Sequence, residues 1–306
     1  MRVLVLGAGA IGGYYGARLI EAGTDVAFLV RPARAALLAD RGLRVRSEHG
    51  DFARPVTALT TVAASVHYDL VIVSCKAFDL EPAIAAIMPA LGPDTRVLPL
   101  LNGLHQLDAL DAAFGAPRVL GGVCHISVTL DDDGAVRQFG GLQRLTFGSR
   151  DPAHAVPPCI VAALCSLGEQ VVARSDILTA MWEKFALITA LAGITCLMRG
   201  SVGEIAATAE GAHLARCLYA ECAQVAQCSG HPPSSAAMTE AERILTMPRS
   251  PLKASMLRDL ERGARTECEH ILGDMRDRAM AHALDTPLLA AALTHMRVYE
   301  DTRMAG

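Results

Sequence analysis

A glycine-rich segment directly after the first apolar run of the chain constrains its fold more than any other feature. Residues 2–6, RVLVL, form a short apolar run, and Gly7-Ala8-Gly9-Ala10-Ile11-Gly12 follows it with the spacing G-x-G-x-x-G. A helical pattern then extends from about 11 to 22. A strand, a glycine turn and a helix in this order predict a βαβ unit with a dinucleotide phosphate site at the helix N-terminus.

The residue types within this motif match the steric demands of a phosphate-binding turn. Gly7 permits the tight turn, Gly9 lets the backbone approach a pyrophosphate, and Gly12 permits close packing of helix on strand. Ala10 and Ile11 open the predicted helix, where free N–H groups and the positive end of the helix dipole favour a phosphate. The alternative is a tight turn that binds nothing. The place of the motif in the chain favours dinucleotide binding.

The rest of the first half alternates between short apolar strands and helical segments. Strands are predicted at 25–30, 69–74 and 96–101, with helical segments near 80–91 and 104–114. This alternation predicts an α/β fold of the Rossmann type, in which a mostly parallel sheet is covered on both faces. Further β segments, expected to extend or close that sheet, lie at 119–126, 135–139, 143–148 and 169–173.

The chain changes character after Ser175. Residues 176–198 are predicted to form one long apolar helix, capped by Ser175 or Asp176, and helical periodicity continues to the end. The predicted breaks between helices lie at 200–201, 229–233, 248–251 and 285–287. We therefore expect a Rossmann-type domain over 1–174 and an all-α domain over 175–306.

Basic and amide side chains follow the predicted strands, where such sheets bind their ligands. Arg31 directly follows the second strand, at a position where NAD-binding proteins of this type carry an acidic residue. A guanidinium suits the 2′-phosphate of NADP, so Arg31, with Arg34 one turn on, predicts NADP(H) as the cofactor. Lys76 and Asn102 follow the next two strands and are further candidates for cofactor contacts. The alternatives are a surface arginine, a solvated lysine and an Asn-Gly turn.

Eight segments of the chain together resemble one enzyme family. They are GAGAIG at 7–12, Arg31, CKAFD at 75–79, LLNGL at 100–104, MWEKF at 181–185, SVGEI at 201–205, SMLRD at 255–259 and Thr266-Glu267. In this order they are similar to the motifs of ketopantoate reductases, over essentially the whole chain. The resemblance implies NADPH-dependent reduction of ketopantoate to pantoate, a step of pantothenate biosynthesis. It also places Arg31 and Lys76 at the phosphate and ribose end of the cofactor.

The same resemblance implies a role for matching residues outside the glycine motif. Lys184 would be the general acid that protonates the ketone oxygen as hydride arrives from NADPH. Glu267 would position the hydroxyl and interact with Lys184. Asn102 would contact the nicotinamide and substrate, and Ser255 would bind the substrate carboxylate. The chemistry agrees independently, because hydride addition leaves an alkoxide that needs a proton and a nearby positive charge. Without the resemblance, a surface lysine and a solvated glutamate are the alternatives.

The match fails on one face of the long predicted helix. The family places Asn four and eight residues after Lys184, where this chain has Ile188 and Ala192. A further family Asn is replaced by Val202, while Thr195 remains polar on the same helix face. Each lost hydrogen bond to a charged group is worth roughly 1.5–3 kcal/mol. We therefore expect either ketopantoate or a more apolar 2-oxo acid as substrate, with Thr195 among its contacts.

Three other functions fit parts of this pattern. Opine or imine reductases and hydroxyacid dehydrogenases also combine a Rossmann domain with a helical domain. The motifs around Ser255 and Glu267 favour the ketopantoate-type function over both. A non-catalytic NADP-binding sensor would explain the lost Asn residues, but the retention of Lys184 and Glu267 argues against it.

Composition and spacing argue against several partners. The net charge of −4, the lack of a basic stripe and the 4% aromatic content argue against nucleic acid. No apolar run reaches about 18 residues, so no membrane span is expected. Nine cysteines without a C-x-x-C pair and ten histidines without ligand spacing predict neither a disulfide framework nor a metal site. We expect a cytoplasmic protein, and the apolar helical half favours a homodimer.

Overall fold

The structure, a computed structural model, describes residues 1–305 and forms two compact units. The first unit comprises Met1–Leu101 and Gln106–Ile177, and the second comprises Asn102–His105 and the chain from Leu178 onward. The short segment that carries Asn102 therefore belongs with the helical half of the chain. Gly306, the last residue of the predicted helical domain, lies outside the described residues.

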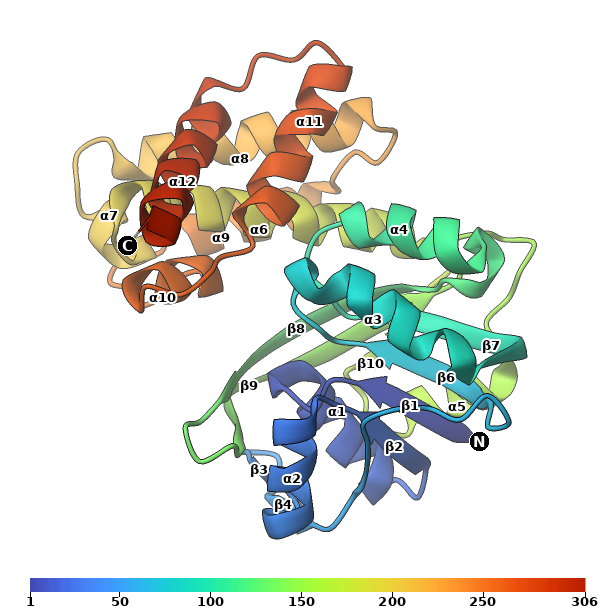
Figure 1. Cartoon of the computed structure of the whole chain (residues 1–306). Helices are drawn as coiled ribbons and strands as arrows, with labels where there is room; N and C mark the ends of the chain where they lie inside the picture. Colours follow the sequence, from blue (N-terminus) through green and yellow to red (C-terminus); the bar gives the residue numbers. More distant parts are fainter. Residues whose placement is uncertain (306) are drawn as a thin grey trace. The chain divides into compact units, whose positions relative to one another are not determined.

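The first unit contains a five-stranded parallel sheet, which confirms the predicted α/β fold (Figure 1). Its strand order is β5 (Thr57–Leu59), β2 (Asp25–Leu29), β1 (Arg2–Leu6), β6 (Tyr68–Val73) and β7 (Leu91–Pro99). The apolar runs of β1 and β6 are buried, as expected for strands covered on both faces. The helices along this part of the chain are α1 (Ala10–Glu21), α2 (Pro32–Arg41), α3 (Leu80–Ile87) and α4 (His105–Phe114), with short 3-10 turns at Ala77–Asp79, Met88–Ala90 and Ala116–Arg118.

The prediction that the later β segments extend the parallel sheet is wrong, because they form a second sheet. Its strands are β10 (Val171–Ala173), β9 (Val136–Gly148), β3 (Leu43–Arg46), β4 (Phe52–Arg54) and β8 (Gly121–Leu130). The segments predicted at 135–139 and 143–148 are one strand, β9, whose two edges pair with β8 and with β3 and β10. With both edges occupied, β9 has no edge left for the first sheet, and an isolated bridge between Val97 and Val119 links β7 to the segment before β8.

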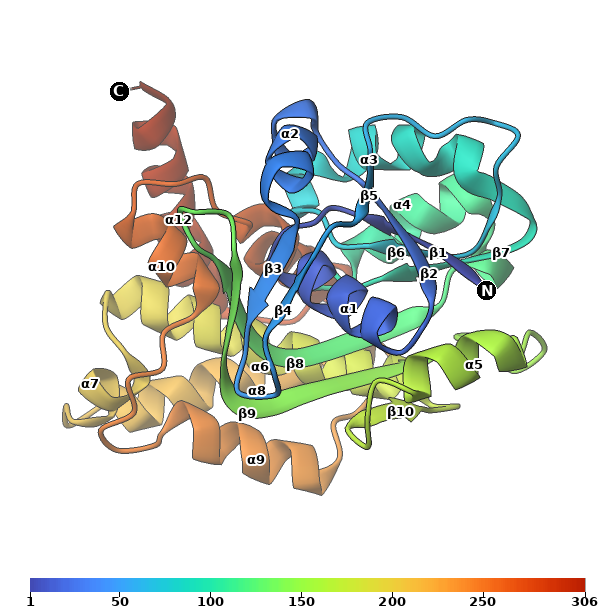
Figure 2. The same cartoon turned by 90° about the horizontal axis from the view of Figure 1, so that it is seen from below.

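Helix α1 packs between the two sheets and joins them into one core. It contacts β1 and β2 of the parallel sheet on one side and β3, β8 and β9 of the second sheet on the other (Figure 2). Seven of its twelve residues are buried, including two tyrosines. Helix α5 (Pro158–Cys165) covers β10. The glycine turn at the start of α1 is therefore held on a rigid scaffold, as a binding site requires.

The second unit is helical throughout its long segment, and the predicted helix breaks are confirmed. Its elements are α6 (Ile177–Met198), α7 (Val202–Ala206), α8 (Gly211–Cys228), α9 (Ser235–Leu245), α10 (Ser255–Glu261), a π-helical turn (Glu269–Gly273), α11 (Asp274–Ala281) and α12 (Pro287–Ala305). Helix α8 is central, with contacts to α7, α9, α11 and α12. Fully buried side chains of this unit include Leu218, Cys222, Met275, Leu289 and Met296.

Helix α6 is long and apolar enough to cross a membrane, by length and composition. However, 61% of its most apolar window is buried inside the protein, which is typical of a core helix. Phe185, Ala190 and Ile194 are among its buried residues. The apolar character of α6 is thus accounted for by packing, and its few polar side chains stand out as candidates for chemistry.

Candidate functional site

The glycine turn of the first unit has the geometry that its sequence predicts. Gly7 has φ +94°, a conformation that side chains rarely adopt. A Cβ on Gly12 would lie 2.1 Å from the Gly7 carbonyl oxygen and 2.2 Å from the Ser74 hydroxyl, so no side chain fits there. That hydroxyl donates to the carbonyls of Leu6 and Gly7, at 2.9 and 3.2 Å. Ser74 thus fixes the turn, a role that the sequence analysis missed.

The start of α1 suits the pyrophosphate of a dinucleotide. A Cβ on Gly9 would have no atom within 4 Å, so the backbone is open to a ligand at this point. Within the described chain, no side chain caps the helix at Gly9, and its first turn, opened by Ala10 and Ile11, contains no acidic residue. The helix therefore presents uncapped N–H donors and its positive dipole end, which together favour an anion. This arrangement fits the predicted cofactor.

The two arginines after β2 have different environments. Arg31 precedes α2, and its side chain is 76% exposed, with Nη2 2.7 Å from Asp79 Oδ1. Arg34 instead supports the turn, because Nε donates to the Ala8 carbonyl at 3.0 Å and Nη1 donates to the Gly134 carbonyl at 2.8 Å. Burial lowers the pKa of Arg34. Arg31 is therefore the arginine that remains accessible to a cofactor phosphate.

Lys76 lies at the start of the turn after β6, on the same segment as Asp79. It is exposed, and its carbonyl accepts from the Asp79 N–H at 2.9 Å. This short turn therefore places Lys76 at the C-terminal edge of the parallel sheet. The ion pair between Asp79 and Arg31 places Arg31 at the same edge. That edge is where ligands of such sheets bind.

In the second unit, a hydrogen bond joins two of the predicted site residues. Lys184 of α6 donates from Nζ to Asn102 Oδ1 at 2.9 Å. Lys184 is partly buried, and its helix neighbours Trp182 and Phe185 are only 4% and 1% exposed. The surroundings are therefore partly desolvated, as the sequence predicts. Segment 102–105, which carries Asn102, belongs to the same unit as Lys184.

The backbone next to Glu267 is fixed by hydrogen bonds of the preceding residue, Thr266. Thr266 is buried, and both its N–H and its hydroxyl donate to Glu300 Oε1 at 2.7 Å. The Glu267 carbonyl accepts from the Ile271 N–H at 3.1 Å, at the start of the π-helical turn. Glu300 of α12 is thus a residue that the sequence analysis missed. Only the Thr266-Glu267 pair could have drawn attention to this segment.

The predicted substrate residues differ in accessibility. Ser255 is exposed and begins α10. Thr195 is fully buried, and its hydroxyl donates to the Leu191 carbonyl one turn earlier, at 2.6 Å, so the structure argues against a substrate contact there. Ala192 and Val202 are also buried, whereas Ile188 is half-buried. Of the apolar replacements, Ile188 is the one closest to solvent.

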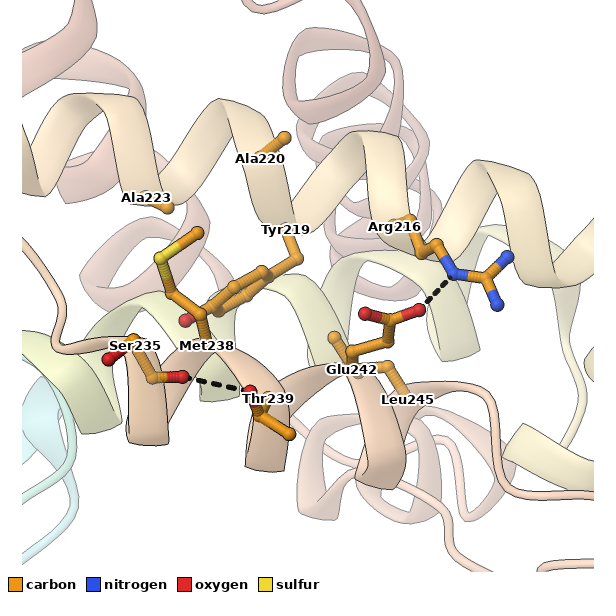
Figure 3. A pocket seen from close by; sticks show the side chains of 9 residues that line it. All are labelled: Arg216, Tyr219, Ala220, Ala223, Ser235, Met238, Thr239, Glu242 and Leu245. Atoms are coloured by element: carbon orange, nitrogen blue, oxygen red, sulfur yellow. Dashed lines mark hydrogen bonds and ion pairs between the residues drawn. The ribbon is translucent and has the colours of Figure 1, made fainter.

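A separate groove of about 420 Å³ lies between α8 and α9 (Figure 3). It is lined by Arg216, Tyr219, Ala220, Ala223, Ser235, Met238, Thr239, Glu242 and Leu245. Burial raises the pKa of the Tyr219 phenol to about 12, and Arg216 pairs with Glu242 at 2.7 Å. The groove contains none of the predicted site residues.

Cysteines and potential metal ligands are dispersed in the structure. All nine cysteines are free thiols. Within residues 1–305, no three His, Cys, Asp or Glu side chains come together as a metal site would require. Burial raises the pKa of Cys196 to about 12 and that of Cys222 further still, so these thiols are poor nucleophiles.

The chain is similar to known proteins over nearly its whole length. Two models of one family match the chain, "Ketopantoate reductase PanE/ApbA" over residues 3–152 and its C-terminal counterpart over 176–300. An uncharacterized oxidoreductase, YkpB of Bacillus subtilis, is 34% identical over 98% of this chain and 99% of its own.

Solved structures share the fold over nearly the whole chain. A PanE/ApbA family ketopantoate reductase from Ralstonia eutropha superimposes with a TM-score of 0.88 at 26% identity, over 99% of this chain and 100% of its own. D-mandelate dehydrogenase, solved with NADH and anilino(oxo)acetate, gives the same TM-score and coverage at 20% identity, a likeness of fold alone. The chain therefore belongs to the ketopantoate reductase family and is an oxidoreductase that acts on CH–OH donors.

Proposed function

We propose that this protein uses NADPH to reduce a 2-oxo acid to the 2-hydroxy acid, with Lys184 as the proton donor. The observation that carries the proposal is the 2.9 Å hydrogen bond from Lys184 Nζ to Asn102 Oδ1, in partly buried surroundings. The hydrogen bond to Asn102 fixes the direction of the Lys184 ammonium group, which is a hydrogen-bond donor suited to a substrate oxygen. It supplies the positive charge and the proton that an alkoxide requires.

The side chains of the second unit then have distinct roles in the reaction. When bound, the reduced nicotinamide supplies the hydride. Lys184 stabilises the developing charge on the carbonyl oxygen and transfers a proton to it from Nζ. Asn102 holds that ammonium group in place, Glu267 positions the substrate hydroxyl, and the exposed Ser255 binds the carboxylate. Proton transfer by a positioned side chain accelerates such steps about 10²–10⁴-fold.

The residues of the first unit would hold the cofactor. The uncapped N-terminus of α1, from Gly9 to Ile11, would bind the pyrophosphate. Arg31 and Lys76 would bind the 2′-phosphate and ribose. Because a guanidinium favours a phosphate over a ribose hydroxyl, we infer a preference for NADPH over NADH.

The substrate that we favour carries an apolar side chain. Ile188, Ala192 and Val202 stand where the family has amides, and Ile188 is the one of the three that is half-buried and not buried. A hydrogen-bond donor to a hydroxylated substrate is therefore missing at Ile188. An apolar substrate would leave a buried amide without a hydrogen-bond partner, and this lowers its binding affinity. An apolar wall has no such group and binds an apolar substrate without that cost. D-mandelate dehydrogenase, solved with NADH and anilino(oxo)acetate, has the same fold. Ketopantoate remains the second candidate.

NADPH consumption with a panel of 2-oxo acids tests the proposal. The panel should contain ketopantoate beside branched and aromatic 2-oxo acids, each with wild type, Lys184→Ala and the control Arg216→Ala on α8. We expect turnover that Lys184→Ala lowers by about 10²–10⁴-fold and that the control leaves intact. Turnover only with an added amine would indicate an opine or imine reductase. Tight NADPH binding without any turnover would indicate a sensor.

We further propose that the protein works in the cytoplasm as a homodimer. Free thiols at all nine cysteines suit a reducing compartment. Exposed apolar side chains of the helical unit, among them Met238, Val298 and Met304, offer contact surface for a second copy. Light scattering during size-exclusion chromatography would give the mass in solution, and a monomer at all concentrations would contradict the dimer.

A further inference from the structure

A histidine that the proposed mechanism leaves unused lies beside the segment that carries Asn102. His270 belongs to the π-helical turn Glu269–Gly273, just after Thr266-Glu267. Its ring meets the ring of His105 edge-on, with centroids 5.7 Å apart and planes at 86°. Single π-turns occur frequently at functional sites, because they redirect the side chains that follow.

The loop formed by Asn102 and Gly103 contacts His270 directly. Gly103 has φ +88°, and a Cβ on it would lie 3.1 Å from the His270 carbonyl oxygen and 3.3 Å from His270 Cδ2. The His270 ring also hydrogen-bonds the backbone of Asn102. Since Asn102 accepts a hydrogen bond from Lys184, a continuous chain of contacts runs from His270 through Asn102 to Lys184.

The surroundings of His270 favour the neutral imidazole. Burial lowers its pKa and His105 adds to that effect, while Glu267, Asp274 and the hydrogen bond to Asn102 act in the opposite direction. The net shift is downward from the usual value, so the ring is neutral at physiological pH. A neutral ring carries one N–H, and a bond to the Asn102 carbonyl uses it and fixes the tautomer.

We propose that His270 is a positioning residue for the proton-transfer step, an inference that rests on the function proposed above. Its N–H holds the Asn102 carbonyl, and the fixed backbone places the Asn102 side-chain oxygen where Lys184 can donate to it. His270 acts through Asn102 and is not itself the proton donor. Misplacing a reacting group by about 1 Å can cost roughly 100-fold in rate.

Two substitutions of the same residue separate positioning from packing. His270→Phe keeps a ring of similar size and removes the donor, whereas His270→Gln restores an N–H donor. We expect kcat to fall roughly 10- to 100-fold in His270→Phe, with little change in KM. In His270→Gln, kcat should return most of the way to the wild-type value. NADPH affinity, from fluorescence titration, should stay at the wild-type value in both, and Tm should fall modestly in His270→Phe, which leaves the Asn102 carbonyl without its donor. His213→Gln on α8 is the control histidine substitution.

Each other outcome overturns the inference. Wild-type kcat in His270→Phe would show that the donor is dispensable. Equal losses of kcat in both variants would assign His270 to packing. Lys184→Ala, assayed in parallel, tells the two proposals apart. Activity in Lys184→Ala would refute the proposed function itself, whereas an inactive Lys184→Ala beside a fully active His270→Phe would refute only the role of His270.

Discussion

Lys184 and Asn102, 82 positions apart in the sequence, share a hydrogen bond of 2.9 Å. The bond joins the long apolar helix α6 to the segment that follows the last strand of the parallel sheet, and both residues belong to the second unit. In the proposed mechanism, Lys184 supplies charge and a proton, and Asn102 fixes the direction of its ammonium group. The pair is therefore the smallest element whose removal should disable the chemistry while leaving the fold intact.

Substitutions of the two members of this pair should have non-additive effects on kcat when they are combined. We expect Lys184→Ala to lower kcat by about 10²–10⁴-fold. Asn102→Ala should cause a smaller loss, because the lysine remains but is no longer oriented. Groups that act as a unit give double mutants close to the worse single mutant. Kinetics of the two single variants and the double variant measure this coupling, and strictly multiplicative losses would contradict it.

Arg31 should set the preference for NADPH. Loss of a charge-assisted hydrogen bond to the 2′-phosphate costs roughly 1.5–3 kcal/mol, so Arg31→Ala should raise the KM for NADPH about 10- to 100-fold. The KM for NADH should change little. Asp79→Asn, which releases Arg31 from its ion pair, should lower the KM for NADPH. Arg41→Ala at the other end of α2 is the control, and an equal effect there would rule out a specific role.

Two glycines of the same turn should respond differently to alanine. A Cβ on Gly12 would clash with the Gly7 carbonyl and with Ser74, so Gly12→Ala should lower the stability by about 1–3 kcal/mol as well as NADPH affinity. A Cβ on Gly9 meets nothing, so Gly9→Ala should keep its Tm and still lose NADPH affinity. Thermal denaturation with and without NADPH separates the two effects. Full NADPH affinity in Gly9→Ala would place the pyrophosphate elsewhere.

Much of the first unit follows from local sequence signals. The strands around Val3 and Val71 are apolar apart from the exposed Arg2 and Asp69, and the glycine spacing at 7–12 specifies the turn. The second sheet could not be predicted in the same way. Its register depends on the pairing of β9 with β3, residues about 90 positions apart, and no local pattern reports such a distant contact.

The candidate site was also predictable only in part, because some of its residues lie in local motifs and others depend on distant contacts. Lys184 and Asn102 follow recognisable motifs, so sequence alone singles them out. Ser74 and Glu300 each form hydrogen bonds with backbone groups that are distant in the sequence, and such contacts cannot be read from sequence alone. From the sequence, Thr195 is expected to contact the substrate because helical periodicity places it on the same face as Lys184. Periodicity does not reveal that its hydroxyl donates to the Leu191 carbonyl of the preceding turn.

Glu300 should make stability depend on pH in the acid range. Burial raises the pKa of its carboxyl, but hydrogen bonds from the Thr266 hydroxyl and N–H, and from Arg303, outweigh burial and hold the pKa below its usual value. A depressed folded-state pKa gives a stabilisation that is complete above the unfolded pKa of about 4.3 and is lost as the pH falls through the folded pKa.

Glu300→Gln should therefore be less stable than wild type by roughly 1–3 kcal/mol at neutral pH. The difference in Tm between the two proteins should shrink as the pH falls below about 4.3, because the wild-type carboxyl then becomes neutral as well. Thermal denaturation across this range checks the prediction. Glu240→Gln, an exposed pair partner on α9, provides the control. A difference in Tm that stays constant with pH would contradict the assigned role of the charge.

Ile188 should control which 2-oxo acid is preferred. It lies one turn after Lys184, is half-buried, and stands where the family has an amide. Ile188→Asn restores a donor on the same helix face, so kcat/KM for ketopantoate should rise about tenfold relative to an aromatic 2-oxo acid. Leu187→Asn makes the same chemical change one position earlier, on a different face, and should leave the ratio unchanged. The ratio of the two kcat/KM values is the measurement. Equal shifts in both variants would show that polarity of the helix in general, and not contact with the substrate, determines the preference.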